Sequence, residues 1–314
     1  MNYVFQKTAL NAVTALTLAV CTATPVIATG AAPQAIGSPI QERETVLTYW
    51  TNDLLREAEI SPGNEQSPEE VITENGDFLG YAPMQTPYAN HDLSRVNGIL
   101  FYREPNGAHA HCSASVITSS SKSLIVTAAH CVMGTDDIWK ELMMFVPAYN
   151  GTDINNPAPF DKWPIKQAFV HSSVPDGQTI DNDVAVARLH LLPPPLPIGP
   201  GESVEQKIGG ALKPRITENG LFEKVKVTGY PGADRYAGRQ QQCDSYTSVI
   251  AGNTGLGTQN CGLYSGHSGG PMILHPSEEP EVVAVVYNTV SGARLRESTF
   301  GVISRAADDA DKAR

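Results

Sequence analysis

The stretch Gly266-His267-Ser268-Gly269-Gly270-Pro271 is the most informative part of this chain. It places one serine between small residues, on a turn where the backbone can approach another molecule closely. Glycine permits this approach because it has no Cβ atom and tolerates positive φ angles. A serine hydroxyl becomes an effective nucleophile only when a neighbouring base takes its proton. A serine nucleophile here would therefore need a histidine and a carboxylate from elsewhere in the sequence.

The order of the residues excludes one arrangement. The pattern G-x-S-x-G also marks the nucleophile of α/β-hydrolases, in which an acid and then a histidine follow the serine. Here only 46 residues follow Ser268, and the one later histidine, His275, is seven positions away. A parallel sheet and a late histidine do not fit in that length.

The upstream sequence offers a better partner set. His130 lies in Thr127-Ala128-Ala129-His130-Cys131, directly after an apolar segment, and Asp183 directly precedes Val184-Ala185-Val186-Ala187. The separations are 53 residues from His130 to Asp183 and 85 from Asp183 to Ser268. Asp181 is the alternative carboxylate, but Asp183 is favoured because it adjoins the apolar segment. The plain alternative for His130 is a buried structural histidine.

With TAAHC and SGGP in this order, the chain resembles the chymotrypsin-like (trypsin-like) serine peptidases from about Asn97 to Ala306. GILFY, CSASVI, SLIVTAAHCV and MFVPAYNGT narrow the resemblance to the secreted microbial branch related to the V8-like glutamyl endopeptidases. The resemblance implies an all-β fold of two six-stranded antiparallel β-barrels with a short C-terminal helix. The active site would lie in the cleft between the barrels, with His130 and Asp183 in the first and Ser268 in the second.

The resemblance also implies roles for the site residues. His130 would act as general base, Asp183 would orient it, and Ser268 would be the nucleophile. The backbone N–H groups of Gly266 and Ser268 would form the oxyanion hole. Specificity is less defined: the expected pocket residues are Gly262, Val286, Asn288 and Thr289. Gly262 offers no acid for a Lys or Arg side chain, and the strand beside the pocket lacks the histidine of glutamyl endopeptidases, although Arg294 or Arg296 could meet an acidic side chain.

His267 also departs from the better-known enzymes of this family, which carry Asp just before the nucleophile. In those enzymes the Asp pairs with a newly freed N-terminus. A histidine there argues against activation by that ion pair. Removal of a pro-segment is instead expected to relieve blockage or to complete folding. The other histidines at 109, 111, 171 and 190 are expected on the surface.

The first thirty residues differ in composition from the rest. They hold one charge, Lys7, an apolar run from about Leu10 to Val20, and small residues up to Ala31. This composition is typical of a secretory signal peptide; a transmembrane anchor is the alternative, but the run is short and broken by polar residues. We therefore expect a signal peptide over 1–30, a pro-segment or N-terminal extension over 31–92, and a peptidase domain over 93–314 with its barrel junction at about 192–205.

The four cysteines outside the signal segment form an even set in a chain expected to be secreted, to the extracellular space or the periplasm. Two disulfides are therefore expected, and three pairings are possible. The resemblance selects Cys112–Cys131, which would anchor the loop bearing His130, and Cys243–Cys261. A zinc site is disfavoured because no CxxC or HxxxH spacing occurs. No metal or cofactor is expected.

Composition limits the partners. The net charge of −11 does not suit nucleic acid, whose phosphates require clustered Lys and Arg. Protein or peptide substrates, no stable membrane association and a monomer are expected. A second hypothesis is a catalytically silent protease-like binding or adhesion protein.

Apolar periodicity predicts one amphipathic helix over 43–59, and a short polar helix is expected over 304–314. Short apolar runs bounded by turn residues predict strands at 98–102, 114–117, 123–127, 143–146, 184–187, 225–228, 271–274 and 282–287.

Overall fold

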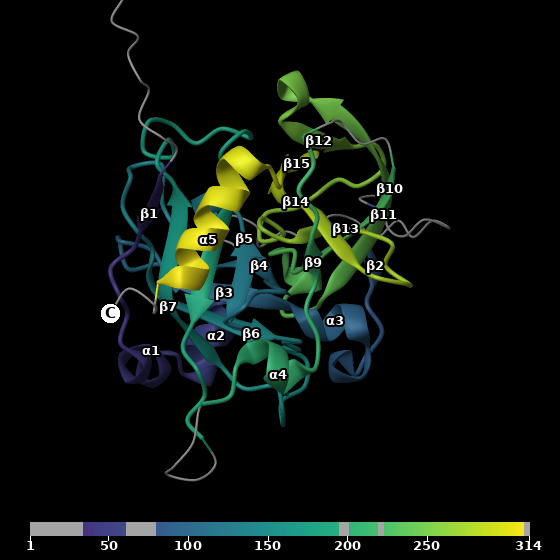
Figure 1. The fold of residues 1–314 in the computed structure, drawn as a ribbon. Helices are drawn as coiled ribbons and strands as arrows, with labels where there is room; N and C mark the ends of the chain where they lie inside the picture. The colour runs from purple at the N-terminus through teal and green to yellow at the C-terminus, as the bar shows by residue number, and fades with distance from the viewer. Residues whose placement is uncertain (1–33, 61–79, 195–200, 219–222, 311–314) are drawn as a thin grey trace, which may run out of the picture. The chain divides into compact units, whose positions relative to one another are not determined.

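The computed structural model describes residues 34–60, 80–194, 201–218 and 223–310. The predicted signal peptide lies outside these residues. Within them, two closed six-stranded antiparallel β-barrels follow each other along the chain, as the resemblance implied (Figure 1).

The first barrel has the strand order β7-β6-β3-β4-β5-β8, and β7 pairs with β8 to close it. Its strands are β3 (Asn97–Arg103), β4 (His109–Ile117), β5 (Leu124–Thr127), β6 (Glu141–Pro147), β7 (Trp163–His171) and β8 (Ala185–Leu189). A further strand, β1 (Ala35–Gly37), pairs with β7 on its outer edge. Eight of the nine residues of β4 are buried, because the outer face of this strand is covered by other parts of the chain.

The second barrel has the order β10-β13-β14-β15-β12-β11 and closes through β10 and β11. Its strands are β10 (Lys224–Gly229), β11 (Gln241–Ile250), β12 (Gly255–Thr258), β13 (Pro271–Leu274), β14 (Glu281–Asn288) and β15 (Ser291–Arg294). Two short strands join its sheet from outside: β2 (Ala82–Pro83) is antiparallel to β11, and β9 (Lys213–Pro214) is parallel to β14. The predicted barrel junction at about 192–205 falls between β8 and β10 and lies partly outside the described residues.

All eight predicted strands coincide with observed ones to within two residues at most ends, and the main exception is the early start of β4. The described helices are α1 (Arg43–Tyr49), α2 (Asn52–Ala58), α3 (Asp92–Val96), α4 (Val204–Ile208) and α5 (Val302–Asp309). The C-terminal helix is thus present, and it begins two residues before the predicted start.

The prediction of a single helix over 43–59 was wrong, because the chain forms two helices separated at Trp50 and Thr51. Trp50 has non-helical backbone angles, and its indole N–H donates to the Leu142 carbonyl oxygen at 2.6 Å. Thr51 then caps α2, since its hydroxyl accepts from the Leu54 N–H at 3.3 Å. Side-chain capping and an anchored tryptophan therefore outweigh the continuous apolar periodicity.

Helix α5 returns from the second barrel to lie against β7 and β8 of the first (Figure 1). Arg188 on β8 donates to the carbonyl oxygens of Ala307 and Asp308 at 3.1 and 3.0 Å. A cation at the C-terminal end of a helix satisfies carbonyls that have no partner within the helix. The two barrels are therefore tied together by the end of the chain. None of the helices in the described ranges has the length and apolar character needed to cross a membrane.

Candidate active site

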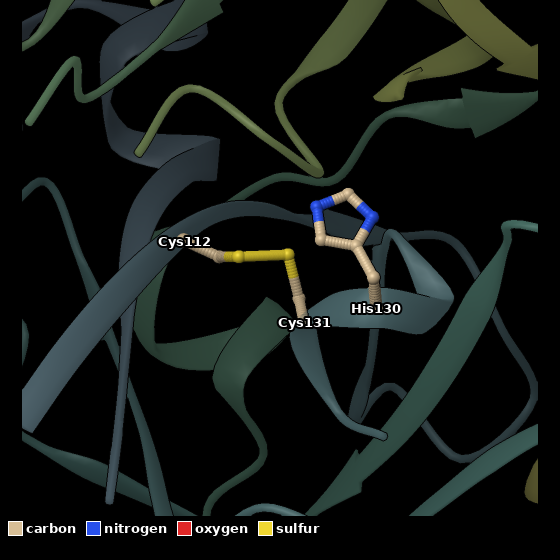
Figure 2. A group of neighbouring side chains, drawn as sticks. All are labelled: Cys112, His130 and Cys131. Atoms are coloured by element: carbon tan, nitrogen blue, oxygen red, sulfur yellow. A yellow bond between two sulfur atoms is a disulfide. The ribbon is translucent and has the colours of Figure 1, made fainter. Parts of the chain in front are cut away.

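His130 lies on a short 3₁₀ turn, Ala129–Cys131, immediately after the fully buried strand β5. The next residue, Cys131, forms a disulfide with Cys112 on β4, with 6.0 Å between their Cα atoms. Figure 2 shows the imidazole beside this disulfide. The second predicted disulfide, Cys243–Cys261, is also present, in the second barrel. The Cys112–Cys131 disulfide therefore attaches the turn that bears His130 to strand β4.

Cys112, Cys131 and His130 bring their sulfur and nitrogen atoms within 4.8 Å of one another. Such a group has the ligand types of a zinc site, but zinc binds thiolate sulfur. Because the two sulfurs are bonded to each other, neither is a thiolate. The two cysteines therefore form a structural disulfide and are not metal ligands, so the imidazole of His130 is available for other chemistry.

Asp183 holds His130 through two hydrogen bonds. Its Oδ1 accepts from the His130 backbone N–H at 2.9 Å, and its Oδ2 lies 2.9 Å from His130 Nδ1. The Asp183 side chain is fully buried, whereas that of His130 is 28% exposed. Burial by itself lowers the pKa of His130, but the charge and hydrogen bond of Asp183 outweigh it and raise the pKa above its usual value. Asp183 therefore makes the imidazole of His130 a stronger base, and the ring is still partly exposed.

The competing carboxylate, Asp181, is engaged elsewhere. It forms an ion pair with Arg296, and Arg296 also approaches Glu218 at 3.5 Å. Of the two candidates, only Asp183 contacts His130 in the described part of the chain.

Ser268 lies on a turn whose backbone requires glycine on both sides. Gly266 and Gly269 have φ angles of +87° and +79°. A Cβ atom at Gly269 would lie 2.1 Å from Thr127 Oγ1 and 2.4 Å from the Ser113 carbonyl oxygen. The turn therefore presses directly onto the first barrel, and only glycine allows the approach.

Ser113 on β4 joins this turn to the first barrel. Its backbone N–H donates to the Ser268 carbonyl oxygen at 2.7 Å, and its hydroxyl donates to the Gly266 carbonyl oxygen at 2.9 Å. The same hydroxyl accepts from the Tyr230 N–H at 2.8 Å. Ser113 directly follows Cys112, so adjacent residues of one strand hold the His130 turn and the Ser268 turn. Among the described residues, no hydrogen bond joins the Ser268 hydroxyl to His130.

Some backbone N–H groups of the Ser268 turn have acceptors within the protein and others do not. Those of His267, Gly269 and Gly270 donate to carbonyl oxygens of Tyr264, Val286 and His267. Within the described ranges, the N–H groups of Gly266 and Ser268 donate to no protein group. Two unpaired donors on either side of one residue can bind an oxygen atom that carries negative charge.

His267, the residue before Ser268, is completely buried. Its Nδ1 lies 2.9 Å from the hydroxyl of Tyr81, and the two rings stack with centroids 5.3 Å apart. Burial lowers the pKa of His267 to about 4, and an interaction with the backbone of Thr228 opposes this fall. The imidazole is therefore neutral at physiological pH, so it cannot form the ion pair with a free N-terminus that an aspartate at this position would form.

The expectation that His111 lies on the surface was wrong, since only 3% of it is exposed. Its Nδ1 and Nε2 lie 2.6 and 2.9 Å from the carbonyl oxygens of Ala58 and Tyr230. Burial lowers the pKa of His111, and the two carbonyl contacts oppose this. Position 111 follows no apolar pattern, so nothing in the sequence indicates that helix α2 covers it. His109, His171 and His190 are partly buried.

The residues expected to line the specificity pocket lie on β14, after it, and before the Ser268 turn. Val286 is buried, whereas Asn288 and Thr289 are exposed, and Gly262 is partly exposed. The N–H of Leu263 donates to the Thr289 carbonyl oxygen at 2.7 Å, which brings these two segments together. The side chain of Arg294 is buried and donates to Thr217, while Arg296 binds Asp181. Both arginines are therefore engaged within the protein.

A family model described as Trypsin matches residues 89–307. The chain belongs to the trypsin family of serine endopeptidases. The match covers both barrels, from before β3 into α5, and excludes the segment that carries β1, α1, α2 and β2. No curated protein matches the sequence.

Solved structures of proteases share the trypsin-family fold with this chain. They include a thermostable serine protease, AL20, from an extremophilic microorganism (19% identity, TM-score 0.58, 72% of this chain and 100% of the other). Protease Anisep from Arthrobacter nicotinovorans has 21% identity and a TM-score of 0.57, over 67% of this chain and 96% of its own. A Glu endopeptidase in complex with MPD has 16% identity and a TM-score of 0.56, over 73% and 96%. At these identities the likeness concerns the fold.

Two residues that contact the segment leading to Ser268, namely Ser113 and Tyr81, were not predicted from the sequence. Ser113 could have been suspected, because it adjoins a cysteine predicted to anchor the His130 loop. Tyr81 has no comparable signal, since it lies outside the two barrels in sequence and in a segment assigned to the N-terminal extension.

The Ser113→Ala substitution is expected to destabilise the protein by about 1–3 kcal/mol, because it leaves the buried Tyr230 N–H without its acceptor. Ser115→Ala is a matched control on the same strand. The hydroxyl of Ser115 is buried and has no partner in the described structure, so its removal should cost little. Urea unfolding of both variants measures the difference. Equal losses of unfolding free energy would contradict the assigned role of Ser113.

The His267→Asn substitution should flatten the loss of stability in acid. The pKa of His267 falls from its usual 6.5 to about 4 on folding, so the unfolded chain binds more protons between these values. The free energy of unfolding of the wild type should therefore decrease by about 3 kcal/mol more than that of the variant between pH 6.5 and 4. Denaturant titrations at several pH values test this. Parallel curves for the two proteins would show that His267 is not held neutral.

Proposed function

We propose that this trypsin-family protein is a secreted serine endopeptidase that acts through Ser268, His130 and Asp183. The observation that carries the proposal is the pair of hydrogen bonds from buried Asp183 to the backbone and ring of His130. The turn bearing Ser268 is bonded to the strand next to the His130 disulfide, which supports a common site. Protein or peptide substrates follow from the family.

The proposed reaction has two halves. Ser268 Oγ attacks the scissile carbonyl carbon while His130 Nε2 takes the hydroxyl proton, and His130 then returns that proton to the leaving amine. Water next attacks the acyl-enzyme with the same base, which releases the acid product and regenerates Ser268. Asp183 keeps the Nδ1–H tautomer of His130 and stabilises the imidazolium formed in each half. The raised pKa of His130 is the ground-state sign of that stabilisation.

The oxyanion of each tetrahedral intermediate would be bound by the backbone N–H groups of Gly266 and Ser268. These groups have no protein acceptor in the described structure and lie on a turn fixed by glycine conformations. Donors held in place before the reaction need no reorganisation when charge develops, and each contributes about 3 kcal/mol in such sites.

For specificity, we propose a pocket formed by Gly262, Val286, Asn288 and Thr289. Gly262 offers no carboxylate, so a preference for Lys or Arg is not expected. A glutamyl preference would need a cation, and Arg294 and Arg296 are already engaged by Thr217 and Asp181. The proposed membership of the V8-like branch therefore rests on the sequence motifs and not on a shared pocket. A peptide library varied at the residue before the cleaved bond tests it.

The proposed location is extracellular or periplasmic. Two disulfides suit an oxidising compartment, and the predicted signal peptide over 1–30 agrees with it. A silent binding protein is not favoured, because all three positions of the proposed triad hold the residue types that the chemistry needs.

The Ser268→Ala variant should lose peptide hydrolysis by at least about 10⁴-fold, because the nucleophile is absent. Its fold should be kept, since the contacts of the turn are made by backbone groups. Cleavage of a mixed peptide set by the purified wild-type and variant proteins measures the loss, and circular dichroism verifies the fold. A wild-type protein with no activity on any peptide would favour the silent binding protein.

The Asp183→Asn variant should lose about 10³–10⁴-fold in kcat, because an amide cannot stabilise the imidazolium and favours the wrong tautomer. Asp181→Asn is the matched control and should stay within a few fold of wild type. In the wild type, kcat/KM should fall as the pH drops through the pKa of His130. This pKa lies above its usual 6.5 because Asp183 raises it. Steady-state kinetics over pH 5–9 provide both readouts. Equal effects at 181 and 183 would overturn the assignment.

A further inference from the structure

Residues 80–84 precede both barrels in sequence, yet they are built into the second one. Ala82 and Pro83 form β2, which pairs with β11, and the Met84 N–H donates to the Gln240 carbonyl oxygen at 3.0 Å. Gly80 crosses close to the Cys243–Cys261 disulfide, where a Cβ atom would lie 2.9 Å from Cys243 Sγ. This segment therefore has the contacts of a barrel strand and not those of a loosely attached leader.

Tyr81 lies in the core of the second barrel, where only 2% of it is exposed. Its ring packs edge-on against Tyr236 and stacks on His267, with centroids 5.2 and 5.3 Å apart. Its hydroxyl accepts from the Tyr264 N–H at 2.7 Å and lies 2.9 Å from His267 Nδ1. One phenol oxygen thus binds both ends of the turn that leads to Ser268.

The second hydrogen bond joins the Tyr81 hydroxyl to Nδ1 of His267. A phenol oxygen can accept two hydrogen bonds and donate one, so this contact forms with either tautomer of a neutral imidazole. The turn between these residues is closed by the His267 N–H donating to the Tyr264 carbonyl oxygen at 3.1 Å. Tyr81 consequently holds the orientation of His267, and with it the peptide groups on either side.

We propose that Tyr81 is a positioning residue for the nucleophile turn, acting through His267, and that residues 80–84 remain in the working enzyme. The inference rests on the proposed function, since it assigns a role within that active site. An uncharged phenol–imidazole contact needs no free α-amino group. The turn is therefore ordered while the chain continues on the N-terminal side of Tyr81, and any released pro-segment ends before that residue.

The Tyr81→Phe variant keeps the ring stack and removes only the hydroxyl. It should lower kcat at least tenfold and leave KM within twofold, because the turn loses its alignment while the binding surface remains. Tyr88→Phe is the matched control, since the Tyr88 hydroxyl is also buried in the N-terminal segment and accepts from the Gln240 N–H at 3.0 Å. That variant should lose stability similarly and keep its kcat. A Tyr81→Phe protein with a kcat within twofold of wild type overturns the proposal.

The mass of the active wild-type protein gives a second test that does not depend on how the variants fold. Mass spectrometry of enzyme labelled by a fluorophosphonate probe should find Tyr81 in every labelled chain. Fully active enzyme whose chain begins after residue 81 overturns the inference and leaves the proposed function intact. A wild-type protein that neither cleaves peptides nor reacts with the probe overturns both, so the two failures are distinguishable.

Discussion

The strand β4 carries the constraint on which the site depends, at the adjacent residues Cys112 and Ser113. The disulfide from Cys112 fixes the turn bearing His130, and Ser113 binds the carbonyl oxygens on both sides of the nucleophile turn. Neighbouring residues of a strand point to opposite faces, so one strand can reach both barrels at once. The distance between the proposed base and nucleophile is thus set by a rigid, buried element and not by loops.

Residues that precede both barrels in sequence complete this arrangement. Ala58, at the end of α2, contacts His111, which in turn reaches Tyr230 and lies beneath Gly266. Tyr81 supports His267 from the other side. Two buried histidines therefore flank the turn, each contacted by a residue that precedes the family domain. Burial lowers the pKa of both, because ionisation in such surroundings is costly.

The sequence predicted the barrels and the candidate triad because their signals are local. Apolar strands and the TAAHC and SGGP motifs each lie within a few residues, and all eight predicted strands were found. Four of the twelve barrel strands were missed: β7 contains Pro164, and β11 directs Gln241, Ser245 and Thr247 inward. The other two, β12 and β15, are four residues long and contain glycine, so they show no apolar run. The roles of Tyr81 and Ser113 depend on contacts between distant segments, which no local pattern encodes, and the break at Trp50 depends on a hydrogen bond to β6.

The proposed active site has a single reactive serine, Ser268, activated by His130. Its most direct test is peptide mapping of protein inactivated by a fluorophosphonate, followed by mass spectrometry of the modified peptide. The predicted result is one adduct, on Ser268, whose formation slows as pH falls below the pKa of His130. An adduct on another residue, or formation that is unchanged by replacing His130 with alanine, would contradict the account.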